Sequence, residues 1–137
     1  MSDKTEAPAR SDTVLVVESD VLVRTAISEY LRHCGYRAIE AASADEAIAV
    51  LTQPNIPVDV VFSIADMAGS MNGFGLAKWV RQNRPELPVV LTGNVVKAAH
   101  VAGDLCEEGP HLQKPYEPQQ VVEWIKRLRN TKVSCRP

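Results

Sequence analysis

The chain alternates short, almost wholly apolar runs with longer segments whose apolar residues recur at helical spacing. Residues 13–17 form a nearly continuous apolar run, which is typical of a strand buried on both faces. After it, Val21, Ile27 and Leu31 give an approximately helical stripe that ends at Gly35. This pattern predicts one strand followed by one amphipathic helix.

The same alternation continues to the end of the chain. The other predicted strands are 36–41, 58–64, 89–92 and 110–113, and the other predicted helices are 44–51, 73–83, 95–105 and 118–129. Ser43 and Glu46 have the spacing of a capping box, and Pro118 suits the first position of a helix.

Successive strand–helix units predict a parallel sheet covered by helices on both faces. The fold class that follows is α/β, a flavodoxin-like (βα)5 three-layer sandwich with strand order 2-1-3-4-5. In such a sheet, ligands bind beyond the carboxyl ends of the strands, here those of the first and third.

Length and charge narrow the function classes. A chain of 137 residues suits one domain, which we place at 12–130, after a disordered leader (1–11) and before a polar tail (131–137). The net charge of −2 does not favour binding of nucleic acid or of an anionic membrane. The sequence has neither an apolar stretch long enough for a membrane helix nor a secretory signal, so we predict a cytoplasmic protein.

The three cysteines, Cys34, Cys106 and Cys135, are far apart and lack metal-ligand spacing. An odd number without such spacing predicts reduced thiols in a cytosol. Cys34 falls in an apolar helical pattern and is predicted to be a small core residue rather than a redox-active thiol.

Polar residues follow several of the predicted strands. Glu18 and Asp20 come after the first, Thr92 ends the fourth, and Lys114 with Pro115 follows the fifth. Because the carboxyl ends of parallel strands meet at one edge of a sheet, we expect these side chains to lie near one another.

With these motifs in this order, the chain from about residue 12 to 128 resembles the CheY-like receiver domain of two-component response regulators. The segments that carry the resemblance are 14–20, 58–64, 67–73, 87–93 and 112–116. The resemblance implies an acidic cluster for Mg²⁺ at Glu18, Ser19 and Asp20, a switch hydroxyl at Thr92 and a phosphate-binding lysine at Lys114. It also implies that the phosphorylated aspartate would fall at position 64.

Position 64 is Ile64, which has no oxygen to accept a phosphoryl group or to bind a metal ion. The chain therefore resembles an atypical receiver, or pseudo-receiver, that lacks its phosphoacceptor. Asp66, two residues further on, is either a substitute acid or an ordinary turn residue. Asp20 is either a metal-ligand remnant or a helix N-cap.

The other departures also weaken the implied site. Ser19 replaces one acid and Ala68 replaces the usual proline, so we predict no cofactor, or Mg²⁺ bound weakly at best. Lys114 then needs Glu18 or Asp20 as a partner, and the bond to Pro115 is a candidate cis peptide. His111 stands where relatives carry an aromatic switch; it is either a pH-sensitive substitute or an ordinary exposed strand histidine.

The predicted function is that of a single-domain, response-regulator-like protein of bacterial two-component or phosphorelay signalling, and not of an enzyme. It would act by contact with a histidine kinase or another signalling protein, or as a homodimer, through the last strand and the flanking helices. The residues expected on this face are Lys97, His100, His111, Tyr116, Trp124 and Lys126. Two alternatives stay open: phosphorylation of Asp66 or Asp20 with Mg²⁺, and a domain cut from a larger kinase.

Overall fold

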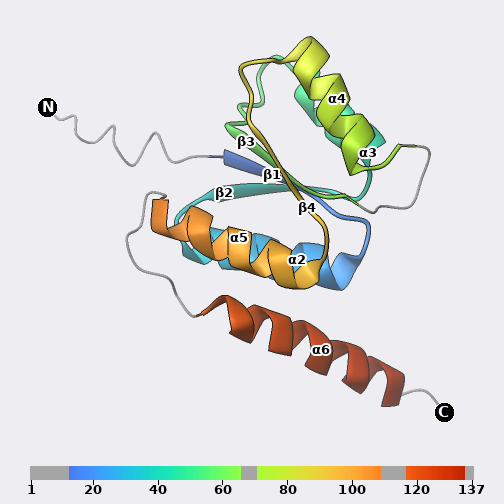
Figure 1. Ribbon diagram of the computed structural model, residues 1–137, viewed down its shortest axis with the longest axis vertical. Coiled ribbons are helices and arrows are strands. Elements are labelled where there is room, and N and C mark those ends of the chain that lie inside the picture. Colours follow the sequence, from blue (N-terminus) through green and yellow to red (C-terminus); the bar gives the residue numbers. More distant parts are fainter. Residues whose placement is uncertain (1–12, 66–70, 109–116, 135–137) are drawn as a thin grey trace, which may run out of the picture.

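The computed structural model describes residues 13–65, 71–108 and 117–134. Its elements in chain order are β1 (Thr13–Val17), α2 (Val21–His33), β2 (Arg37–Ala41), α3 (Ala44–Leu51), β3 (Val60–Ile64), α4 (Gly73–Asn83), β4 (Val89–Thr92), α5 (Val95–Glu108) and α6 (Pro118–Ser134) (Figure 1). Strands and helices alternate as the sequence predicts as far as α5.

Four parallel strands form the sheet, in the order β2-β1-β3-β4. β1 is central and every one of its residues is buried, because β2 pairs with one of its edges and β3 with the other. The order confirms the predicted arrangement for the first four strands. The predicted fifth strand, 110–113, lies outside the described residues.

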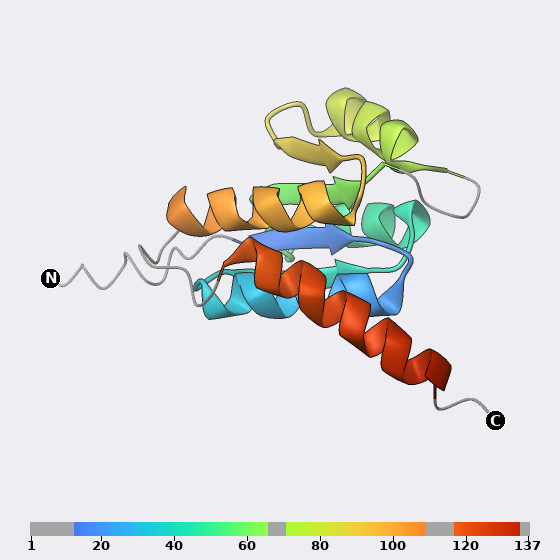
Figure 2. The ribbon, with the colours of Figure 1, turned by 60° about the horizontal axis from the view of Figure 1, so that its bottom comes forward.

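Helices cover both faces of the sheet, as predicted (Figures 1 and 2). On one face, α3 and α4 pack over Leu15, Val17 and Val61 in one apolar core. On the other, α2, α5 and α6 pack over Val14 and Phe62 in a second apolar core. The sheet therefore separates two cores, each with its own set of helices.

Local signals fix the ends of the early helices. Asp20 caps α2, since its Oδ1 accepts hydrogen bonds from the backbone N–H groups of Leu22 and Val23 at 2.9 and 3.4 Å. The helix stops at Gly35, whose φ of 104° is left-handed, and Tyr36 N–H bonds back to the Leu31 carbonyl.

The capping box before α3 is present as predicted. Ser43 Oγ accepts the Glu46 N–H at 3.1 Å, and the Glu46 carboxylate accepts the N–H of Ala42 at 2.8 Å. The return bond thus goes to the residue before the cap.

The carboxyl-terminal boundary differs from the prediction. α6 runs to Ser134, so residues 131–134, which we assigned to a polar tail, are helical. The segment Thr131–Ser134 contains no glycine or proline that would end the helix. The predicted leader lies outside the described residues, and in the part of the chain that is described no helix is long and apolar enough to cross a membrane.

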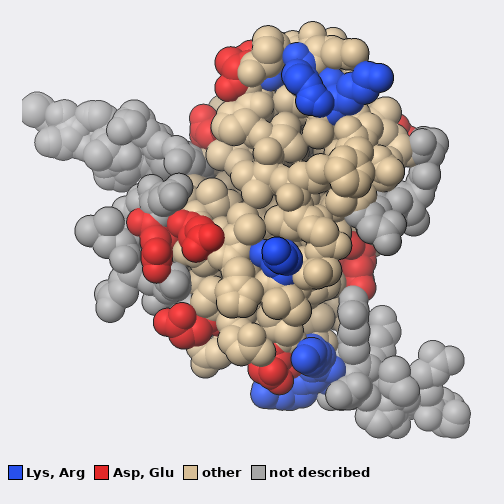
Figure 3. All heavy atoms as spheres, viewed as in Figure 1, with Lys and Arg blue, Asp and Glu red and all other residues tan. Residues whose placement is uncertain are grey.

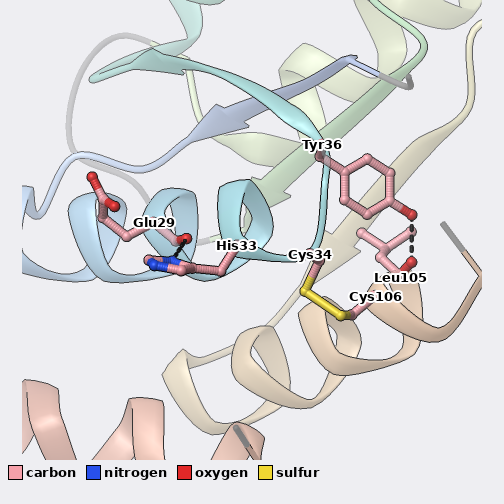
Figure 4. The surroundings of a disulfide bond; sticks show 6 residues. All are labelled: Glu29, His33, Cys34, Tyr36, Leu105 and Cys106. Atoms are coloured by element: carbon pink, nitrogen blue, oxygen red, sulfur yellow. Dashed lines mark hydrogen bonds between the residues drawn. A yellow bond between two sulfur atoms is a disulfide. The ribbon is translucent and has the colours of Figure 1, made fainter. Parts of the chain in front are cut away.

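The prediction of reduced cysteines was wrong for two of the three. Cys34, which caps the end of α2, and Cys106, near the end of α5, form a disulfide with their Cα atoms 5.3 Å apart (Figure 4). Their sequence separation of 72 residues gave no signal of pairing. The packing of α5 against α2 brings them together. The prediction that Cys34 is a core residue is confirmed, because it is fully buried.

Candidate functional site

The carboxyl ends of β1, β3 and β4 meet at one edge of the sheet. Ile64, the last residue of β3, is in register with Thr92, the last residue of β4. The strands stay joined just beyond that pair, because Ala65 N–H donates to the Thr92 carbonyl at 2.7 Å. Glu18 follows β1 directly, so three of the predicted site residues lie at this edge.

The carboxylates of Glu18 and Asp20 both accept hydrogen bonds from backbone N–H groups. Glu18 is buried, its N–H donates to the Ala41 carbonyl, and its Oε2 accepts the N–H of Asp20 at 2.7 Å. Asp20 holds the first turn of α2 as its N-cap. Both acids therefore shape the turn between β1 and α2, and the N-cap interpretation of Asp20 is confirmed.

Ile64 is a core residue. Only 7% of it is exposed, and it belongs to the same apolar core as Phe62 and the helices α2, α5 and α6. Next to it, Ser63 is fully buried and its hydroxyl donates to the Ile64 carbonyl at 3.2 Å. Position 64 thus extends the hydrophobic core, as its aliphatic side chain favours.

Thr92 is 5% exposed, and its hydroxyl oxygen has no hydrogen-bond partner among the described residues. A buried hydroxyl is normally satisfied, so an unsatisfied one at a site edge calls for an explanation. Ile64, across the strand pair, offers no polar side-chain atom to it.

α4 begins against this edge. A Cβ at Gly73 would lie 2.7 Å from the Ile64 carbonyl oxygen and 2.8 Å from the Ala65 Cα. Such contacts with backbone cannot be relieved by a side-chain rotation, so glycine is required for the close approach. Gly73 N–H also donates to the Ala65 carbonyl at 3.0 Å, which fixes the end of β3 to the start of α4.

The remaining predicted site residues, Asp66, His111 and Lys114, lie outside the described residues, as does the bond from Lys114 to Pro115. Within the described ranges, no group of three or more His, Cys, Asp or Glu side chains is placed to hold a metal ion. Glu18 and Asp20 alone are few oxygen donors for Mg²⁺, which takes about six ligands. The prediction that Mg²⁺ binds weakly at best stays a prediction, as does the alternative in which Asp66 helps to hold the ion.

Among the described residues, Glu86 has a lowered pKa, and it lies away from this edge. Arg84 donates a hydrogen bond to Glu86 at 2.9 Å and lowers the pKa of that exposed carboxyl. These residues precede β4, at the opposite end of that strand from Thr92.

Four of the six residues predicted for the contact face lie among the described residues. Lys97 and His100 are exposed on α5, Lys126 is exposed on α6, and Trp124 is partly buried against the core below. His111 and Tyr116 lie outside the described residues. In the view of Figure 3, acidic groups lie near the end of α5, and lysine and arginine side chains gather over α4.

The whole arrangement can be compared with known families. The model of the response regulator receiver domain matches residues 14–126 of the chain. The chain belongs to this family. The receiver domain predicted from the motifs is thereby confirmed, and family membership places the chain among receivers rather than catalytic enzymes.

Curated relatives differ widely in length, from proteins of about this size to much longer ones. The rice two-component response regulator ORR3 (Oryza sativa) is 33% identical over 133 residues, covering 93% of this chain and 98% of that protein. The transcriptional regulatory protein ResD of Bacillus subtilis is 28% identical over 84% of this chain and 47% of its own length. The receiver thus spans about half the length of the curated transcriptional regulators ResD and AruR (Pseudomonas aeruginosa).

Solved structures support the fold. A receiver domain protein from Clostridium thermocellum matches with a TM-score of 0.57 at 21% identity, over 90% of this chain and 98% of that one. A putative response regulator from Chloroflexus aurantiacus matches with a TM-score of 0.55 at 31% identity, over 86% and 97%.

Sequence reasoning missed two features of this receiver. The first is the disulfide between α2 and α5, for which the sequence carries no spacing signal. The second is a cavity of about 400 Å³ between α4 and β4, lined mainly by apolar residues that include Phe74, Ala77, Leu87 and Leu91. Phe74 is 64% exposed. The sequence signal for the cavity was an aromatic residue outside the apolar stripe of that helix.

Proposed function

We propose that this receiver acts in two-component or phosphorelay signalling through protein–protein contact, without taking a phosphoryl group. Ile64 is the observation that carries the proposal. It is buried in the core at the end of β3, and its side chain has no nucleophilic atom. Phosphoryl transfer needs such an atom in line with the phosphorus.

The surroundings of Ile64 support the same proposal. Glu18 and Asp20 hold backbone N–H groups, and Thr92 has no hydrogen-bond partner among the described residues. Ser19 is exposed and supplies no carboxylate. We therefore propose that Mg²⁺ binds weakly at best, and calorimetric titration giving micromolar affinity would contradict this.

The alternative is a receiver that is still phosphorylated, on Asp66 or Asp20, with Mg²⁺. Incubation with acetyl phosphate and Mg²⁺, followed by intact mass measurement, separates the two. We expect no gain of a phosphoryl unit. A gain that is lost in Asp66→Asn or Asp20→Asn would establish the alternative and end the proposal.

An engineered acceptor provides the positive control. Ile64→Asp restores a carboxylate at the end of β3, and Ile64→Asn matches its size without a nucleophile. Phosphorylation of the Asp variant alone would indicate that the rest of the pocket, including Lys114, remains competent. In either case, the wild-type result decides whether the natural chain is phosphorylated.

The partner that we propose is a histidine kinase or a related two-component protein in a bacterial cytoplasm. A segment of the sensor kinase CckA of Brucella abortus is 29% identical to 86% of this chain, so receiver sequences of this type also occur within a sensor kinase. We propose no direct contact with nucleic acid, given the net charge of −2. A homodimer through the α5–α6 face is the other form of contact.

The α5–α6 face can be tested by charge reversal. Lys97→Glu on α5 and Lys126→Glu on α6 change exposed residues of the proposed face. Lys78→Glu, on α4 across the sheet, is the matched control. Against purified histidine kinases and phosphotransfer domains of the same organism, we expect the first two to weaken binding by about three- to tenfold. Equal effects of all three would contradict this choice of face.

A further inference from the structure

The Cys34–Cys106 disulfide joins the end of α2 to the end of α5. Cys34 is the C-cap of α2, and Cys106 lies in the last turn of α5 (Figure 4). Both residues are fully buried. The bond therefore lies inside the core between the two helices and is not a surface staple.

The fully buried side chains of α5 other than Cys106 are small, while the larger Val95, Val101 and Leu105 pack against the same core and stay partly exposed. Ala98, Ala99 and Ala102 are all fully buried on its inner face, and Gly103 adds no side chain there. The apolar area that a side chain buries sets its hydrophobic contribution, and a methyl group buries little compared with leucine or isoleucine. The disulfide therefore adds a covalent link to a helix face whose fully buried alanines each bury little apolar area.

A second contact sits beside the disulfide. The hydroxyl of Tyr36, just before β2, donates a hydrogen bond to the carbonyl of Leu105, the neighbour of Cys106 (Figure 4). Both the disulfide and this hydrogen bond therefore help to fix the position of the end of α5. If the sulfurs separate, the Tyr36 hydrogen bond and the apolar packing of Leu105 still link this end of α5 to the core.

α6 depends on α5 in turn. A Cβ placed on Gly103 would lie 2.5 Å from the Cγ of Pro118, so the first residue of α6 rests directly on α5. Val121, Val122 and Ile125 of α6 are buried in the same core as the disulfide. A shift of α5 is therefore transmitted to α6, whereas α3 and α4 pack in the other core, across the sheet.

We propose that Cys34 and Cys106 form a reversible thiol–disulfide site that controls how firmly α5 and α6 pack on α2. In the reducing step, two molecules of a small thiol such as glutathione donate two electrons and two protons. The S–S bond breaks, two cysteine thiols form and glutathione disulfide is released. In the reverse step, glutathione disulfide accepts the electrons and the protein bond re-forms.

The oxidised form presents the α5–α6 surface as a fixed unit, and the reduced form presents it loosened. This inference is independent of whether the chain is phosphorylated or which partner it binds. It also reconciles the bond with a cytoplasmic location, where disulfides are uncommon and are usually transient or redox-sensing.

Hydrogen exchange of the full chain, followed by mass spectrometry, tests the proposal. Oxidised protein is compared with protein kept reduced by dithiothreitol, with intact mass confirming the gain of two hydrogen atoms. On reduction, we expect the increase in amide exchange rate in α5 and α6 to be about tenfold larger than the increase in α3 and α4. Re-oxidation with glutathione disulfide should restore the original pattern.

Two variants complete the design. Cys106→Ser should exchange like the reduced wild type and ignore dithiothreitol, whereas Cys135→Ser should respond as the wild type does. If Cys106→Ser does not fold, Cys34→Ser, which removes the same bond, serves in its place, with folding checked by far-UV circular dichroism. An equal acceleration in every element, no change in α5, or free alkylation of Cys34 and Cys106 before reduction would each overturn the proposal.

Discussion

At the scale of single residues, Thr92 allows a direct test of whether the predicted switch hydroxyl still has a partner. Its hydroxyl is buried, yet it has no hydrogen-bond partner among the described residues. Replacing an unsatisfied buried hydroxyl by a methyl group removes a desolvation cost without leaving a cavity. We expect Thr92→Val to leave the free energy of unfolding unchanged or to raise it by up to about 1 kcal/mol.

Urea denaturation of the variant measures this change. Ser63→Ala is the control, since the Ser63 hydroxyl is also buried but does donate a hydrogen bond, so its removal should destabilise. A loss of more than about 1 kcal/mol in Thr92→Val would mean that the hydroxyl has a partner, such as Lys114 or a bound ion.

Asp20 gives a second prediction at this scale, because a cap and a metal ligand respond differently to the same substitutions. As an N-cap, it accepts N–H groups through one oxygen, which asparagine also provides. We expect Asp20→Ala to cost about 1 kcal/mol of stability, and Asp20→Asn to cost much less.

Thermal unfolding with and without Mg²⁺ checks the assignment of Asp20. A wild-type midpoint that rises with Mg²⁺, and an Asn variant whose midpoint does not, would show that the carboxylate binds the ion. Equal midpoints under both conditions are the outcome expected for a cap.

At the scale of elements, the entry of α4 decides how closely that helix approaches the site edge. Gly73 lies against backbone atoms of Ile64 and Ala65, whereas a Cβ at Gly75 would meet the flexible side chain of Met71 at 2.6 Å. We expect Gly73→Ala to lower the free energy of unfolding by about 1–3 kcal/mol, since backbone must move.

Gly75→Ala is the matched control within the same helix. Met71 can rotate away, and alanine favours helix over glycine by up to about 1 kcal/mol, so this variant should be neutral or more stable. Equal destabilisation by both substitutions in chemical denaturation would show that helix propensity or general crowding, and not the approach to β3, controls the position.

The elements also show what local sequence can predict. The Ser43 capping box and Gly35 act on backbone within a few residues, so their roles followed from local spacing. For Asp20 the same spacing gave the N-cap as one of two interpretations. The meeting of Ile64 and Thr92 followed from parallel pairing. By contrast, the isolation of the Thr92 hydroxyl and the contact of Gly73 with β3 depend on how elements pack, which periodicity does not encode.

At the scale of the whole molecule, the same limit explains the cysteines. The odd number and wide spacing of the cysteines predicted reduced thiols. Their pairing instead depends on the packing of α5 against α2, which brings together residues 72 positions apart in the chain. The predicted strand order specified which strands are neighbours, but it did not specify which helix packs against α5. The long sequence separation gave no signal of the bond, and it also increases the effect of the bond on the free energy of unfolding.

Closing a loop of this length removes much of the freedom of the unfolded chain. For 72 residues, the chain-entropy model gives a stabilisation of about 4 kcal/mol. Small domains have a total free energy of unfolding of about 5–15 kcal/mol, so the bond would supply a large part of it. We therefore expect dithiothreitol to lower the free energy of unfolding by about 4 kcal/mol, measured by urea denaturation under oxidising and reducing conditions.

The comparison between variants decides whether the effect belongs to this bond. Cys34→Ser and Cys106→Ser should each match the reduced wild type and not respond further to dithiothreitol, because either change removes the same cross-link. Cys135→Ser should keep the full difference. If reduction changed stability equally in all of them, the stabilisation would come from other thiol chemistry. If the double variant Cys34→Ser/Cys106→Ser lost about twice as much as either single variant, the two residues would act as separate core side chains and not as one bond.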